Sequence, residues 1–153
     1  MSGYKSRIDA INVLLAGSPL SATNPVDIAA CIKEFDQVYA CARVKPKDRK
    51  GLLQILHSSR ATDGFLKAFV ATNGCYTGSF PTGMGGYLAS LCNHPNPAVG
   101  KLSSARRHHY QQNLVGIRNQ YLHAPDHYPA PASATLPSLL SEMQACIAEV
   151  VAL

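Results

Sequence analysis

The residues best suited to chemistry lie in the short range Arg118–His123, in which an asparagine follows the arginine and a histidine ends the range. Arginine binds phosphate through a rigid fork of N–H donors. Histidine titrates near neutral pH and can accept or donate a proton. Together these groups suit the cleavage of a phosphodiester without metal. One group deprotonates a ribose 2′-OH and the other stabilises the charged pentacoordinate phosphate.

The helical pattern that contains this range begins near Ser103 and stops before Pro125. On an ideal helix five residues turn through about 500°, which leaves Arg118 and His123 roughly 140° apart. Asn119 and His123 are four apart and share a face. Because Pro125 disfavours helix at the residue before it, we expect the last turn to loosen around His123. A structural interpretation stays open, since the helix dipole alone favours a histidine at a helix C-terminus.

Side chains on either side of this range are candidates for binding RNA. Arg107 and Gln111 lie near the helical stripe of Arg118 and could extend a phosphate track, or they could belong to an exposed polar face. His127 and Tyr128 follow closely, and they either line the same cleft or decorate a loop. The sequence alone leaves both pairs of interpretations open.

The range Arg118–His123 resembles the signature of HEPN-domain proteins, in its common form of Arg, Asn, three residues and His. The apolar range Val115–Ile117 before it and a proline-containing loop after it fit the same pattern. The resemblance implies a small helical bundle that forms a homodimer, with the two motifs meeting in a cleft at the interface. It also implies a metal-independent endoribonuclease, in many members a toxin or antiviral effector of prokaryotes.

The resemblance assigns roles to three residues of this chain. Arg118 and His123 would be catalytic, and Asn119 would support or orient them. The expected products carry a 2′,3′-cyclic phosphate and a 5′-OH, and no cofactor or metal is expected. The expected partners are RNA, a second copy of the chain, and an antitoxin or other regulatory protein. A glycine-rich segment, 73–86, and a proline-rich segment, 124–137, depart from the family pattern.

The hydrophobic residues recur at helical spacing, and no stretch alternates with the two-residue period of a strand. The sequence therefore predicts an all-α fold, most simply an antiparallel bundle in one domain spanning residues 1–153. Asn24 is expected to cap a helix whose first turn holds Pro25, and Thr62 is expected to cap another that stops at Asn73. The remaining predicted helices cover residues 4–16, 47–58 opened by Pro46, 84–92, 97–123 with a break at Gly100, and 137–152.

Two further features could bind a ligand. Residues 82–86 could cradle a phosphate in a nest of backbone amides, but no lysine follows in the P-loop pattern, so a plain glycine-rich loop is the simpler interpretation. Cys92 with His94, or His123 with His127, could hold a metal. Each pair lacks the second pair that a structural zinc site needs, so we expect no metal.

Composition narrows the class of protein. The net charge of +5 permits an anionic partner without requiring one, and basic residues gather at Lys45–Lys50 and Lys101–Arg107, where they either solvate helix ends or neutralise phosphates. The five cysteines form no CxxC pair, and residues 1–5 lack the apolar region of a signal peptide. We therefore expect reduced thiols in a cytoplasmic protein, and no apolar run approaches the length of a membrane span.

Two other functions remain possible from the sequence. A non-catalytic helical module could hold RNA, a nucleotide or a protein in the same cleft. A helical assembly protein, in which the motif is only a helix end, would account for the low content of charged residues, 15%, and for the broad apolar face of residues 136–151.

Overall fold

Every regular element in the described part of the chain is a helix. The structure is a computed structural model that describes residues 3–45, 47–125, 127–129 and 134–153. The elements are, in chain order, α1 (Gly3–Gly17), α2 (Leu20–Thr23), α3 (Pro25–Ala40), the 3₁₀ turn η1 (Cys41–Arg43), α4 (Lys47–Thr72), α5 (Gly83–Asn93), α6 (Ser104–Tyr110), the π-helical η2 (Gln111–Gly116), α7 (Ile117–Leu122) and α8 (Thr135–Val151). This confirms the all-α prediction.

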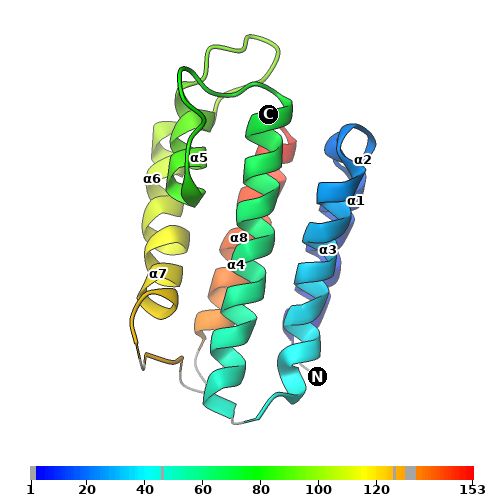
Figure 1. Ribbon diagram of the computed structural model, residues 1–153, viewed down its shortest axis with the longest axis vertical. Coiled ribbons are helices and arrows are strands. Elements are labelled where there is room, and N and C mark those ends of the chain that lie inside the picture. The colour runs from blue at the N-terminus through cyan, green and yellow to red at the C-terminus, as the bar shows by residue number, and fades with distance from the viewer. Residues whose placement is uncertain (1–2, 46, 126, 130–133) are drawn as a thin grey trace.

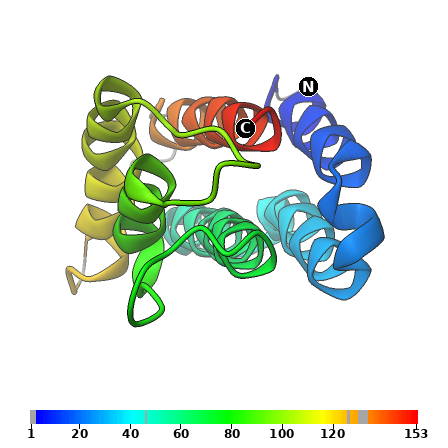
Figure 2. The ribbon, with the colours of Figure 1, turned by 90° about the horizontal axis from the view of Figure 1, so that it is seen from above.

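The long helices lie side by side along the longest axis of the molecule (Figure 1). Seen from above, α4 and α8 occupy the middle, with α1 and α3 on one side and α5, α6 and α7 on the other (Figure 2). Helix α3 runs opposite to α1 and α4, and the run from α6 to α7 is opposite to α8 (Figure 1). Helix α4 contacts α3, α5, α7 and α8, so it positions the other elements.

The core is formed by the apolar stripes that these helices turn inward. In α8 every third or fourth side chain is buried, which is the pattern of an amphipathic helix. Full burial of one such side chain contributes about 1.5–3 kcal/mol. The buried side chains of α8 are Leu136, Leu139, Leu140, Met143, Cys146, Ile147 and Val150.

Two predicted helix starts are confirmed in detail. The Asn24 side chain accepts a hydrogen bond from the Asp27 backbone N–H at 3.3 Å, and Pro25 occupies the first turn of α3. The Ser103 hydroxyl accepts from the Arg106 backbone N–H at 3.1 Å, which starts α6 there and not at Pro97. Each cap satisfies a backbone donor that has no partner inside the helix.

The prediction of a helix break near Thr62 is wrong, because α4 is one continuous helix. The Thr62 hydroxyl caps nothing and donates to the Ser58 carbonyl at 2.9 Å, and the Ser58 hydroxyl donates to the Gln54 carbonyl at 2.8 Å. Such bonds to the preceding turn let buried hydroxyl groups continue a helix. Pro46, predicted to open this helix, lies outside the described residues, as do 126 and 130–133 of the proline-rich segment.

Helix α5 begins at Gly83, which confirms the helix predicted over residues 84–92 to within one residue at this end. Gly74, Gly78 and Gly83 adopt positive φ angles of 59°, 68° and 71°, which glycine reaches without steric cost. Gly85 lies inside α5, and a Cβ added there would stand 3.0 Å from Oε1 of Gln111. Residues 83–86 therefore form the first turn of α5, and the plain glycine-rich loop expected at 82–86 is wrong beyond Thr82.

Candidate functional site

The range Arg118–His123 ends the run of helix from α6 through η2 to α7. Helix α7 ends at Leu122, and His123 is its C-cap residue, with φ −114° and ψ −5°. The His123 backbone N–H still donates to the Asn119 carbonyl at 3.2 Å. The predicted loosening of the last turn before Pro125 is therefore limited to the backbone angles of His123, since its helical hydrogen bond is kept. The π-helical η2 directly precedes α7, and such segments are frequent at functional sites.

Arg118 is close enough to the Asp63 carboxyl group on α4 for its charge to act on the pKa of that group. Burial raises the pKa of Asp63 above its ordinary value, and the positive charges of Arg118 and then Lys67 lower that pKa in part. The Arg118 Nε and the Asp63 Oδ1 are both buried without a hydrogen-bond partner among the described residues. Asp63 also raises the pKa of Tyr87 on α5, after burial as the main cause. Arg118 thus belongs to a polar cluster between α4, α5 and α7.

Asn119 and His123 are in different surroundings from each other. The Asn119 Oδ1 is buried and has no hydrogen-bond partner among the described residues, whereas the His123 side chain is exposed. Within the described residues no hydrogen bond joins Arg118, Asn119 and His123 through their side chains. In one chain the three groups are neighbours on a helix and do not form a connected hydrogen-bond network.

The predicted RNA-binding residues are distributed around the same run of helix. Arg107 and Gln111 are exposed, and Gln111 reaches α5 at Gly85. The exposed His127 ring stacks on Tyr121 of α7, with ring centroids 4.7 Å apart and 20° between the planes. Tyr128 is half-buried. The structure therefore brings His127 to the motif helix, while Arg107 and Gln111 lie farther along it.

Sequence reasoning missed the contribution of α4. The charges of Arg118 and Lys67 both lower the pKa of Asp63 on α4. Arg60 lies one helical turn before Asp63 on the same helix. The Arg60 side chain is 62% exposed although it pairs with Glu34 at 3.0 Å. These residues are far from Arg118 in the chain, and no spacing pattern connects them, so only the packing of α7 on α4 reveals the relation.

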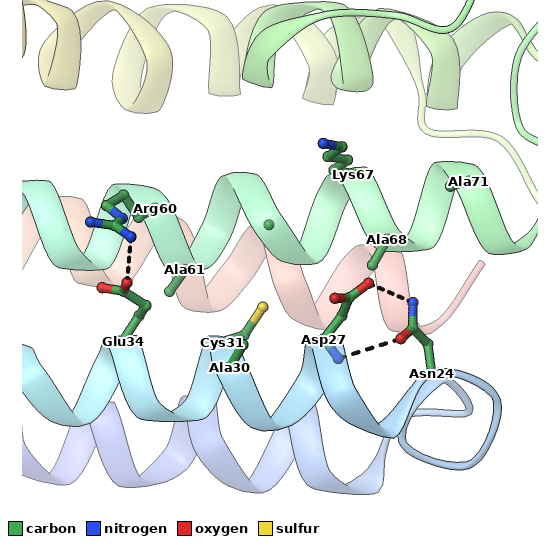
Figure 3. Close-up of a pocket in the computed structure, with 11 residues that line it drawn as sticks. Asn24, Asp27, Ala30, Cys31, Glu34, Arg60, Ala61, Lys67, Ala68 and Ala71 are labelled. Atoms are coloured by element: carbon green, nitrogen blue, oxygen red, sulfur yellow. Dashed lines mark hydrogen bonds and ion pairs between the residues drawn. The ribbon is translucent and has the colours of Figure 1, made fainter.

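A shallow groove between α3 and α4 opens beside Arg60 and Lys67 (Figure 3). Its volume is about 330 Å³. At one end Arg60 pairs with Glu34, and at the other Asn24 bonds to Asp27 (Figure 3). The floor consists of small side chains of α4 together with Cys31, whose pKa burial raises to about 12. This thiol is not a nucleophile near neutral pH, so the groove offers no reactive group of its own.

Neither predicted metal pair gathers further ligands in the described part of the chain, where no group of three potential ligands occurs. The buried His94 ring is fully engaged, since Nε2 donates to the Gly100 carbonyl at 2.9 Å and Nδ1 accepts from the Asn96 backbone N–H at 3.2 Å. His94 therefore serves the loop that follows α5. No described helix combines the length and the low polarity that a membrane crossing requires.

The fold and the site define an all-helical protein with an arginine and a histidine close to a helix C-terminus. Comparisons of the chain with protein-family models, with curated proteins and with solved structures gave no match.

Proposed function

We propose that this protein is a metal-independent endoribonuclease of the HEPN type that acts as a homodimer. The single observation that carries the proposal is the Arg118, Asn119 and His123 set at the end of α7 in an all-helical chain. The exposed His123 imidazole is accessible to substrate, and histidine is the side chain that most often transfers protons in general acid–base catalysis. The Arg118 guanidinium, held beside α4, supplies the charge that an anionic transition state needs.

In the proposed reaction His123 accepts the proton of a ribose 2′-OH, whose oxygen attacks the adjacent phosphorus. Arg118 stabilises the negative charge of the pentacoordinate phosphate, and the 5′-oxygen of the next nucleotide leaves. The products are a 2′,3′-cyclic phosphate and a 5′-OH end, and their formation from the RNA strand requires neither water nor metal. A second copy of the chain supplies another His123, which protonates the leaving oxygen. The general base and the general acid are therefore provided by different chains.

Cations of α4 would also contact an RNA substrate. Lys67 is exposed and close enough to Asp63 to lower its pKa together with Arg118. Arg60 lies two turns earlier on the same helix and keeps most of its side chain in solvent. Phosphates bound along these cations would lead to the motif. We further propose that the enzyme is a cytoplasmic toxin or antiviral effector controlled by an antitoxin or regulatory protein.

The second candidate function is a non-catalytic module that binds RNA, a nucleotide or a protein. The proximity of Asp63 favours it, because a carboxylate offsets part of the Arg118 charge inside the chain. The buried Nε of Arg118 also leaves fewer of its donors for a ligand. In this alternative the motif binds phosphate and cleaves nothing.

Induced expression in cells separates the two. Wild type, Arg118→Ala and His123→Ala are expressed from a tightly repressed promoter, with His108→Ala as the control because His108 is exposed on α6 outside the motif. A nuclease predicts arrested growth and fragmented RNA for wild type and His108→Ala alone. Equal behaviour of all four proteins would favour the binding module.

A further inference from the structure

Positive side chains gather at one end of the bundle, where the chain passes from α3 through η1 into α4 and toward which α7 also runs (Figure 1). Five of the eight residues in the range 43–50, called the cationic end below, are lysine or arginine, and Asp48 is the acidic one. Arg43, Lys45 and Lys47 are exposed, and none of the three forms an ion pair within the described part of the chain. Their charges are therefore available to an anionic partner.

The start of α4 is an unfavourable place for these charges. A helix N-terminus carries a partial positive charge, so acidic side chains stabilise it and basic ones destabilise it. Lys47, Arg49 and Lys50 all lie in the first turn of α4. Stability of the helix does not explain three cations there, whereas an anionic ligand at this end would.

Two contacts connect the cationic end with α7. The His127 ring stacks on Tyr121 of α7, with the ring centroids 4.7 Å apart. The buried Pro129 lies so close to Gly51 of α4 that a Cβ added at Gly51 would stand 2.7 Å from Pro129 Cγ. Two residues of chain span at most about 7 Å, so the stacked rings and the contact on α4 are neighbours.

The stacked rings therefore lie beside exposed cations. Lys47 precedes Gly51 by four residues, so the two positions share the face of α4 on which Pro129 packs. The His127 ring is exposed, and Tyr121 supports it from one side. Proteins that bind single strands of nucleic acid combine a cationic surface for the phosphates with aromatic rings on which bases stack. An acidic protein segment would use the cations alone.

We propose that the cationic end, together with the stacked His127 and Tyr121 rings, binds single-stranded RNA. The phosphates contact Arg43, Lys45 and Lys47, and one base stacks on the outer face of the His127 ring. This surface is separate from the cations beside Arg118, because about 20 Å of α4 lies between Lys50 and Asp63.

The location gives this surface a role in placing the substrate. Tyr121 lies between Arg118 and His123 in the chain, so a base stacked on His127 would bring its strand to the helix that carries the reactive pair. This role rests on the proposed function, whereas binding of RNA depends only on the cationic end and the two rings.

The test measures binding of a fluorescent RNA about twelve nucleotides long to the full chain by fluorescence anisotropy at two salt concentrations. The RNA is 2′-O-methylated throughout, so the proposed cleavage cannot occur. Each phosphate contact contributes about 0.7 to the steepness of log K against log salt for a single strand. Lys45→Gln combined with Lys47→Gln should reduce this steepness by about 1.4 and weaken binding about 60-fold at about 50 mM salt and about tenfold at about 200 mM.

Lys33→Gln combined with Lys101→Gln is the matched control. It removes the same charge from exposed side chains on α3 and in the loop after α5. It should leave the salt dependence unchanged, and circular dichroism should show both double variants folded. Equal loss of binding by the two would mean that net charge attracts RNA, and would overturn the proposal.

The stacked rings are tested separately. His127→Ala should weaken binding about fivefold or more, because a base loses its stacking partner. His127→Phe keeps an aromatic ring without a charge and should bind like wild type. Unchanged binding by His127→Ala, or competition by polyglutamate equal to that by RNA of the same charge, would overturn the proposal for nucleic acid. RNA binding at this end by a protein that cleaves nothing would refute the nuclease alone; cleavage together with undiminished binding by the Lys45 and Lys47 variant would refute this surface alone.

Discussion

Arg118 and His123 are five positions apart but in different surroundings, because only Arg118 lies near the Asp63 carboxyl group. Arg118 faces the Asp63 carboxyl across the contact between α7 and α4, while His123 is exposed at the helix end. A buried carboxyl beside an arginine either orients the guanidinium or costs stability. For Asp63 burial is the larger effect on the pKa, so the ionised carboxylate is less favourable in the folded chain than in water.

Because burial outweighs the attraction to Arg118, we can predict how the free energy of unfolding of Asp63→Asn depends on pH. Because the folded pKa is raised above 3.8, the folded chain binds more protons than the unfolded chain between these two pKa values. The contribution of Asp63 to the free energy of unfolding is therefore largest below pH 3.8 and falls as pH rises through the raised pKa. Asp63→Asn removes this fall, so the variant should gain stability relative to wild type between acid and neutral pH.

Urea unfolding of both proteins across that pH range measures the difference. Asp9→Asn is the control, because Asp9 forms only an exposed ion pair with Lys5. A relative loss of stability for Asp63→Asn at neutral pH would show that attraction to Arg118 outweighs burial. If Asp63 also orients Arg118, the variant should cleave RNA more slowly while remaining folded.

The cysteines provide a separate test of the core. Iodoacetamide should alkylate native Cys92 first, since the Cys92 side chain is partly exposed and the other four are buried. Burial raises the pKa of each of the others, to about 12 for two of them, and only the thiolate reacts. Mass spectrometry should show one adduct, absent from Cys92→Ser. Equally fast labelling of a second thiol would contradict the packing. The buried thiols are Cys31, Cys41, Cys75 and Cys146.

At the scale of elements, the continuity of α4 has a direct consequence at Gly64. Glycine inside a helix costs about 1 kcal/mol relative to alanine. A Cβ at Gly64 would meet Cys31 Sγ at 3.5 Å, an ordinary contact distance. Gly64→Ala should therefore raise the free energy of unfolding by about 0.5–1 kcal/mol. Gly83→Ala is the contrasting variant and should be destabilised, because Gly83 has φ +71°.

Chemical denaturation of the two variants checks this pair of expectations. Destabilisation by Gly64→Ala would mean that α3 and α4 pack more closely than in the structure, or that α4 breaks near Thr62 as the sequence predicted.

Helix starts that depend on local chemistry were predictable, and those that depend on burial were not. Asn24 with Pro25 and Ser103 mark helix starts because their caps use neighbours in the chain. Thr62 looked like the same signal, but its hydroxyl is buried and bonds backwards into α4. Whether a hydroxyl caps a helix or continues it depends on the packing around it, which a single segment does not reveal.

The candidate site also has a part that the sequence could predict and a part that it could not. The set of Arg118, Asn119 and His123 could be predicted because it occupies one segment. The position of Asp63 opposite Arg118 could not, since it arises from the contact between two helices distant in the chain. The π-helical form of η2 was also unforeseen, and ideal helical angles do not apply across it.

At the scale of the whole molecule, the proposed site needs two chains. The protein should therefore have twice the mass of the 16.4 kDa chain by light scattering. If the two motifs share a cleft, inactive Arg118→Ala and inactive His123→Ala should regain part of the cleavage activity when mixed and allowed to exchange subunits. Such mixed dimers contain one intact arginine and one intact histidine from different chains. A monomer at all concentrations would contradict the composite site.

The measurement that tests the central claim most directly is cleavage of single-stranded RNA by the purified protein in the presence of a metal chelator. General acid–base catalysis contributes about 10²–10⁴-fold, so His123→Ala should slow cleavage by roughly that factor. Arg118→Lys keeps the charge but loses the fork of donors, and should also be impaired. We predict fragments with 2′,3′-cyclic phosphate and 5′-OH ends from wild type. Intact RNA, or cleavage that His123→Ala and Arg118→Lys leave unchanged, would contradict the account.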